Sequence, residues 1–322
     1  MKAARRRRRV VLPLAFTACC LAAGPARSDE PERGAEGGGT PAVTPYEVPA
    51  PAWEPRFTEA VRLEDEERFA EAARVFEEVA AGLPGESHPR WRAARAWVRA
   101  GARLPLAQKE QRLALFERAD REAAAGVAAD AACAECYLYR FVALSRAATT
   151  RGIFSAARHA GEMADLLARA EELEPTHVDA PWNQELGNLY FAAGVLYRVL
   201  PDSALAQMTL GVRGDPARAL SYLRRAVALT PSRIDYRMEL AATLLCQGRR
   251  EKEDEPVAEG RELLASVDRL PVRQWSDPVD QVHAEVLRAE PARACDYGRE
   301  EWLAEGIGAE ATSPAGGAAD PD

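Results

Sequence analysis

The sequence is poor in histidine, which is the commonest metal ligand and a frequent general acid or base. It has four histidines, His88, His159, His177 and His283, and none stands at a spacing typical of zinc ligands. Aromatic residues make up 7% of the chain. Nucleophile elbows, phosphate-binding loops and dinucleotide-binding glycine patterns are missing. The sequence therefore predicts no metal site, no cofactor and no enzymatic activity.

The sequence also lacks an apolar run long enough to span a membrane. The stretch Val10 to Leu21 has the length of a signal-peptide core and follows the basic run Arg5 to Arg9. Ala26-Arg27-Ser28 places small residues at the −3 and −1 positions of a cleavage site. Residues 1–28 are thus predicted to be a signal peptide, which implies export to the periplasm or cell envelope. A transmembrane anchor is the alternative.

A lipid anchor is a second open alternative at this end of the chain. Cys19 follows Phe16-Thr17-Ala18, which resembles a lipobox with Phe where Leu is preferred. Cys19 is therefore the lipidation candidate.

Acidic residues outnumber basic residues once the signal peptide is removed. Residues 1–28 hold seven basic residues and no acidic one, so the remaining chain has 35 basic against 50 acidic residues, a net charge of −15. A body this acidic repels phosphate backbones and anionic membrane surfaces. We therefore expect no nucleic-acid partner.

Four cysteines remain after cleavage, and an even number in an oxidising compartment indicates disulfides. The obvious pairing joins Cys133 to Cys136 and Cys246 to Cys295, among three possible connectivities. Cys133-x-x-Cys136 could also exchange disulfides as a thiol oxidoreductase does. A thioredoxin-like site needs a preceding strand, and no segment here predicts one, so structural disulfides are the favoured interpretation.

Composition divides the chain into segments. Residues 29–53 are rich in Gly and Pro and are expected to form a disordered linker, and residues 305–322 a disordered tail. The body between them, residues 54–304, is rich in Ala, Leu, Glu and Arg, which are good helix formers. An all-α domain is predicted there.

The body repeats one helical pattern. Phe69, Ala72, Phe76 and Val79 share one helix face and are followed by Pro84. Two later segments repeat this pattern, namely Met163, Leu167 and Ala170 before Pro175, and Ala219, Leu223 and Ala226 before Pro231. Residues 85–130 fit a longer helical pair, and insertions interrupt the pattern at 201–214 and 249–256. The run Arg249 to Glu255 holds both signs of charge and is expected to form an exposed insertion loop.

These positions resemble the tetratricopeptide repeat, including the first-helix motif Leu186-Gly187 with Tyr190. The resemblance implies an α-solenoid of stacked antiparallel helix pairs with degenerate repeats. A narrower resemblance links Trp91-Arg92-Ala93-Ala94, Cys133-Ala134-Glu135-Cys136 and Glu174-Pro175 to two groups of irregular repeat proteins. These are the regulators of microtubule dynamics and the periplasmic T-component of TRAP transporters.

The resemblance implies a groove lined by the first helix of each pair. By repeat position, the residues expected to face it are Tyr137, Arg140, Gln184, Asn188 and Phe191. The predicted function is a non-enzymatic exported scaffold or adaptor for a protein or peptide of the cell envelope. The alternative is a small-ligand-binding accessory of a TRAP-type transporter, whose partner would be a solute-binding protein.

Overall fold

The computed structural model describes residues 53–312, apart from the side chains of Ile153 and Thr312. The predicted signal peptide, Cys19, nearly all of the predicted linker and the end of the predicted tail lie outside these residues. The first half of the described chain contains α1 (Glu54–Asp65), α2 (Phe69–Gly82), α3 (His88–Arg103), α4 (Lys109–Ala129), α5 (Ala134–Arg151), α6 (Ile153–Leu173), β1 (Val178–Ala180) and β2 (Asn183–Gln184). The second half contains α7 (Glu185–Val199), α8 (Ala204–Leu210), α9 (Pro216–Leu229), α10 (Ile234–Glu251), α11 (Asp254–Val267), α12 (Asp277–Ala289), η1 (Pro291–Asp296), α13 (Arg299–Ala304) and η2 (Ala309–Thr312).

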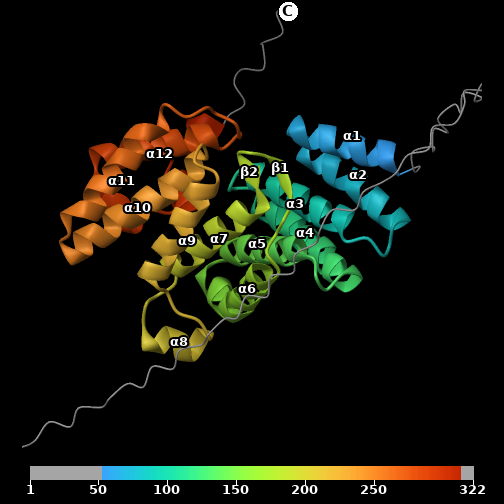
Figure 1. Ribbon diagram of the computed structural model, residues 1–322, viewed down its shortest axis with the longest axis horizontal. Helices are drawn as coiled ribbons and strands as arrows, with labels where there is room; N and C mark the ends of the chain where they lie inside the picture. The colour runs from blue at the N-terminus through green and yellow to red at the C-terminus, as the bar shows by residue number, and fades with distance from the viewer. Residues whose placement is uncertain (1–52, 313–322) are drawn as a thin grey trace, which may run out of the picture. The chain divides into compact units, whose positions relative to one another are not determined.

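The helices are arranged as consecutive pairs that stack on one another. α1 packs on α2, α3 on α4, α5 on α6, α7 on α9, and α10 on α11 (Figure 1). The first helices of successive pairs also touch, since α3 contacts α5 and α5 contacts α7. The predicted α-solenoid of helix pairs is therefore confirmed.

The repeated apolar positions form the seams between these helices. Ala72, Phe76 and Val79 of α2 are at most 4% exposed. Each of the three helices that carry the pattern ends two residues before its proline, as α2 does at Gly82 before Pro84. Proline cannot continue a helix and restricts the residue before it, so it fixes where the pair turns.

Close helix contact depends on small residues. A Cβ atom on Gly194 of α7 would lie 2.5 Å from Cγ of Leu223 in α9. The missing side chain therefore sets the spacing of this pair. Trp91 and Trp97 of α3 are 2% and 1% exposed and lie in the core.

Two segments differ from the expectation. The charged run Arg249 to Glu255 is not an exposed loop, because α10 continues to Glu251 and α11 begins at Asp254. Lys252 takes a positive φ of 61° there, and the Glu253 amide donates to the Gly248 carbonyl at 2.9 Å. This helix-ending turn replaces the loop.

The second difference is a two-stranded antiparallel hairpin between α6 and α7, formed by β1 and β2. Beyond α13, Ile307 lies against α12, since its carbonyl oxygen is 3.1 Å from Nε2 of His283.

Candidate functional site

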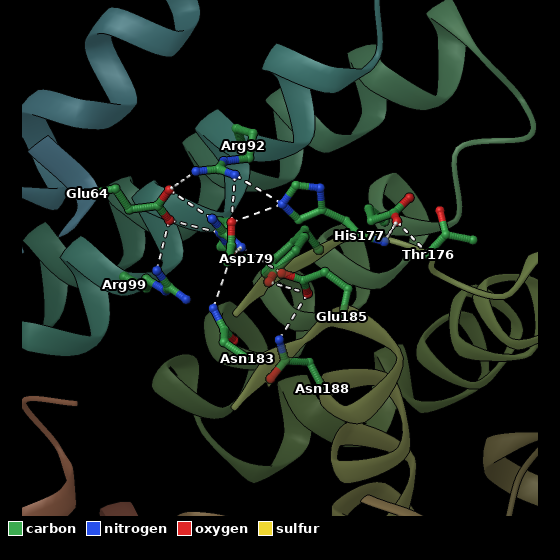
Figure 2. A network of polar contacts seen from close by, with 12 residues as sticks. Glu64, Arg92, Arg99, Thr176, His177, Asp179, Asn183, Glu185 and Asn188 are labelled. Atoms are coloured by element: carbon green, nitrogen blue, oxygen red, sulfur yellow. Dashed lines mark hydrogen bonds and ion pairs between the residues drawn. The ribbon is translucent and has the colours of Figure 1, made fainter. Parts of the chain in front are cut away.

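A highly charged buried region lies on α3, where its arginines contact Asp179 of the hairpin (Figure 2). Arg92 and Arg95 stand one helical turn apart, so their side chains share a face. Their side chains are only 4% and 2% exposed. Glu64 of α1 accepts hydrogen bonds from both, at 2.7 Å from Arg92 and at 2.8 and 2.9 Å from Arg95. Arg99 adds a further bond to Glu64 at 2.8 Å.

The hairpin supplies a second carboxylate to these arginines. Asp179 accepts from Nη1 of Arg92 at 2.9 Å and also contacts Nη1 of Arg95. Nε2 of His177 and Nδ2 of Asn183 lie 2.9 and 3.0 Å from its oxygens. A hairpin with strands of three and two residues is not stable alone. Asp179 therefore links the hairpin to α3.

The third carboxylate is Glu185, the first residue of α7. It is 1% exposed and accepts hydrogen bonds from Arg95 and from the Tyr139 hydroxyl, each at 2.7 Å. The Tyr139 ring stacks on Trp91 with centroids 5.9 Å apart. One network therefore ties α1, α3, α5, α7 and the hairpin together.

Electrostatics keep two carboxylates of this network, Glu64 and Asp179, ionised. Burial alone would raise the pKa of Glu64, but Arg95, Arg99 and Arg92 outweigh it and lower the pKa to about 2. For Asp179, too, burial opposes ionisation, while His177 and the arginines hold its pKa well below the usual range. A carboxylate with so low a pKa is a weak general base. The character of this network is thus structural. We call it the clamp, and it consists of Glu64, Arg92, Arg95, Asp179 and Glu185.

An open pocket of about 400 Å³ lies beside the clamp. It is lined by residues of α3, of the start of α5 and of the segment before β1, including His88, Trp91, Cys133, Glu135 and His177. The Glu135 carboxylate accepts from the amides of Thr176 and His177 at 2.9 and 3.0 Å, so it holds the segment that enters the hairpin.

The five predicted groove residues do not form one site in the structure. Tyr137 and Arg140 face the neighbouring helices, where Tyr137 lies under Arg169 of α6 and Arg140 is near Asp120 of α4 and Glu162 of α6.

Gln184, Asn188 and Phe191 lie toward the following pair instead. Asn188 accepts from the Tyr236 hydroxyl at 2.6 Å, Phe191 stacks on that ring, and Gln184 reaches the Leu229 carbonyl. Whether any of the five binds a partner stays a prediction.

Both expected disulfides are present, Cys133–Cys136 at the start of α5 and Cys246–Cys295 between α10 and η1. Sequence analysis missed the clamp, although one signal was available. Arg92, Arg95 and Arg99 follow a spacing of three and four residues through an Ala- and Trp-rich helix, which places them on one face. Arginines at this spacing among Ala and Trp residues indicate buried ion pairs.

Within residues 53–312, no cluster of three or more His, Cys, Asp or Glu side chains could hold a metal ion. In the same range, no helix has the length and apolarity needed to cross a membrane.

No family model and no curated protein matches this sequence. Among solved structures, the chain is similar to one described as the functional characterization of Pseudomonas aeruginosa PilF. That match covers 78% of this chain and 91% of the other, at 15% identity and a TM-score of 0.43. At these values the assignment of the solenoid depends on the helix packing described above.

Proposed function

We propose that this chain is an exported, non-enzymatic scaffold that holds a protein or peptide partner. The observation that carries the proposal is an exposed apolar surface on α6 and α8. Phe154, Leu205 and Met208 are 86%, 63% and 78% exposed. Large apolar side chains that gather on a surface are typical of protein contact sites.

The geometry of α8 explains why these side chains point outward. Ala206 is 5% exposed, and the Leu210 carbonyl approaches Gly161 of α6, so this side of the helix faces the body. Leu205 and Met208 are three residues apart and share the opposite side. Phe154 precedes Gly161 by seven residues, so it lies on the same side of α6 as the α8 contact.

Two further features support a binding role in an oxidising compartment. α8 has no charged residue and occupies the insertion at 201–214, so it adds a surface that the repeat itself does not need. The two disulfides and the signal-peptide pattern of residues 1–28 favour export.

The test is crosslinking in intact cells. A photoreactive amino acid at Met208 should give a discrete adduct, and the same group at Glu172, an exposed residue elsewhere on α6, should give none. Replacing Leu205 with Ser should weaken the adduct formed from Phe154 without changing the circular dichroism spectrum. Equal adducts from Met208 and Glu172 would overturn the proposal. Mass spectrometry of the mature N-terminus tests export and lipidation at Cys19.

A further inference from the structure

The Cys133–Cys136 disulfide lies at the start of α5 and borders the open pocket beside the clamp. We infer that this disulfide is an exchangeable one, which accepts two electrons from a pair of thiols on a partner protein. The inference is independent of the apolar surface on α6 and α8.

The two sulfurs are in different surroundings. Cys133 lines the pocket and is 6% exposed, whereas Cys136 is fully buried and is not part of the lining. Behind Cys136 lies Gly126 of α4, where a Cβ atom would stand 2.6 Å from Sγ of Cys136. Of the two cysteines, Cys133 is therefore the one that the pocket presents to an incoming thiolate.

The start of α5 stabilises negative charge on Cys133. This residue is the N-cap of an 18-residue helix, and its Sγ accepts a hydrogen bond from the Cys136 amide at 3.1 Å. A helix N-terminus favours a thiolate and lowers its pKa. Stabilising the reduced form makes a cysteine pair more oxidising, so the disulfide is disposed to take electrons.

As a purely structural element, this disulfide would add little to the stability of the fold. It closes a loop of three-residue separation within one helix start, whereas Cys246–Cys295 has a separation of 49 and joins α10 to η1. In the chain-entropy treatment the stabilisation from a disulfide grows with the length of the loop that it closes, so the shorter loop contributes less. The fold thus depends less on the disulfide that borders the pocket.

The exchange can be written with all atoms and electrons in place. A thiolate of the partner attacks Sγ of Cys133, and the bond to Cys136 breaks, with Cys136 leaving as a thiolate. The second thiolate of the partner then attacks the partner's sulfur in this mixed disulfide and releases Cys133 as a thiolate. The partner gains a disulfide, and Cys133 and Cys136 become a dithiol.

The pocket keeps its shape through this reaction. Glu135 lies between the two cysteines, and its bonds to the Thr176 and His177 amides hold the first turn of α5 to the hairpin segment. These bonds do not involve sulfur, so reduction leaves them in place.

The experiment compares the two disulfides of the same protein. Oxidised full-length protein is equilibrated in dithiothreitol redox buffers, its free thiols are alkylated, and each cysteine peptide is quantified by mass spectrometry. We expect Cys133–Cys136 to open with at least about tenfold less reductant than Cys246–Cys295, because the start of α5 stabilises the Cys133 thiolate in the reduced form. The circular dichroism spectrum should not change while it opens.

Two single-cysteine variants provide the second readout. With 5,5′-dithiobis(2-nitrobenzoate), Cys133 of a Cys136→Ser protein should react about tenfold faster at pH 7 than Cys136 of a Cys133→Ser protein, because only Cys133 borders the pocket. Opening of both disulfides together, or equal rates in the two variants, would overturn the inference. Crosslinking from Met208 uses neither cysteine, so the two proposals can fail separately.

Discussion

The guanidinium of Arg112 lies 2.6 Å from the carboxylate of Glu300, 188 residues further along the chain. Arg146 of α5 donates to the same carboxylate at 2.9 Å. A helix at the end of the described chain is therefore fixed to the second and third helix pairs. Burial alone would raise the pKa of Glu300, but Arg146 and Arg112 outweigh it and lower the pKa.

Replacing Glu300 with Gln should lower the free energy of unfolding by about 1–3 kcal/mol, because the 3%-exposed Arg112 side chain loses its charged partner. Urea unfolding followed by circular dichroism measures this loss. The control is Glu305→Gln, which breaks the exposed pair with Arg293 and should cost less than about 1 kcal/mol. Equal losses in the two variants would show that the Arg112–Glu300 contact does not stabilise the fold.

Helix spacing in the α7–α9 pair gives a second prediction. Gly194→Ala places a methyl group 2.5 Å from the Leu223 side chain, so the helices must separate, and we expect a loss of about 1–3 kcal/mol. Gly82→Ala at the end of α2 is the matched control, since a Cβ atom there meets nothing within 4 Å. That variant should be unchanged or up to about 1 kcal/mol more stable. Thermal melts of both variants decide the point.

The solenoid could be predicted because the sequence signals for its helices and turns lie within short segments of the chain. Phe76 and Pro84 show how: an apolar residue at helical spacing marks the seam, and a proline marks the turn. The same rules misassigned Arg249 to Glu255, where charge suggested a loop. Arg and Glu are good helix formers, and a single residue in the left-handed region, Lys252, is enough to connect α10 to α11.

The clamp could not be assembled from sequence for a different reason. Arg95 and Asp179 are 84 residues apart, and nothing local says that they meet. The hairpin strands are too short to show alternation, and their position depends on tertiary contacts such as this one. The arginine spacing on α3 could have predicted buried charge, but the carboxylates that pair with these arginines are brought there only by the tertiary fold.

The clamp predicts that stability falls in acid. The folded pKa of Glu64, about 2, lies below its unfolded value, so its contribution is present above about pH 4.5 and is lost as the pH falls toward 2. Glu64→Gln should cost about 3 kcal/mol at pH 7, since three arginines lose a buried partner. The difference from wild type should shrink between pH 5 and pH 2 in urea titrations.

Glu59 of the same helix provides the control for this titration. Its pair with Arg56 is exposed, so Glu59→Gln should cost less than about 1 kcal/mol at any pH. A Glu64→Gln effect that stays constant between pH 5 and pH 2 would contradict the proposed ionised clamp.

Asp280 of α12 should act in the opposite direction. Burial, reinforced by Asp235 and Asp277, outweighs Arg299 and raises the pKa of Asp280 to about 7. A raised folded pKa means that the stability tied to the protonated form is lost as the pH rises from about 4 to 7. The stability of Asp280→Asn relative to wild type should therefore improve between pH 4 and pH 8. A difference that is flat with pH would rule out the raised pKa.

The two disulfides should contribute unequally to stability. Removing Cys246–Cys295 by serine substitution frees a loop of 49-residue separation and should cost about 4 kcal/mol, whereas removing Cys133–Cys136 should cost about 2 kcal/mol. The larger loss arises because Cys246–Cys295 is the covalent link between α10 and η1, and the unfolded chain gains most freedom when it is cut. Urea unfolding of the two double-serine variants under identical conditions measures both values. Equal losses, or a larger loss for the Cys133–Cys136 variant, would mean that this disulfide supports the fold directly. Reduction of Cys133–Cys136 during the proposed exchange would then destabilise the start of α5.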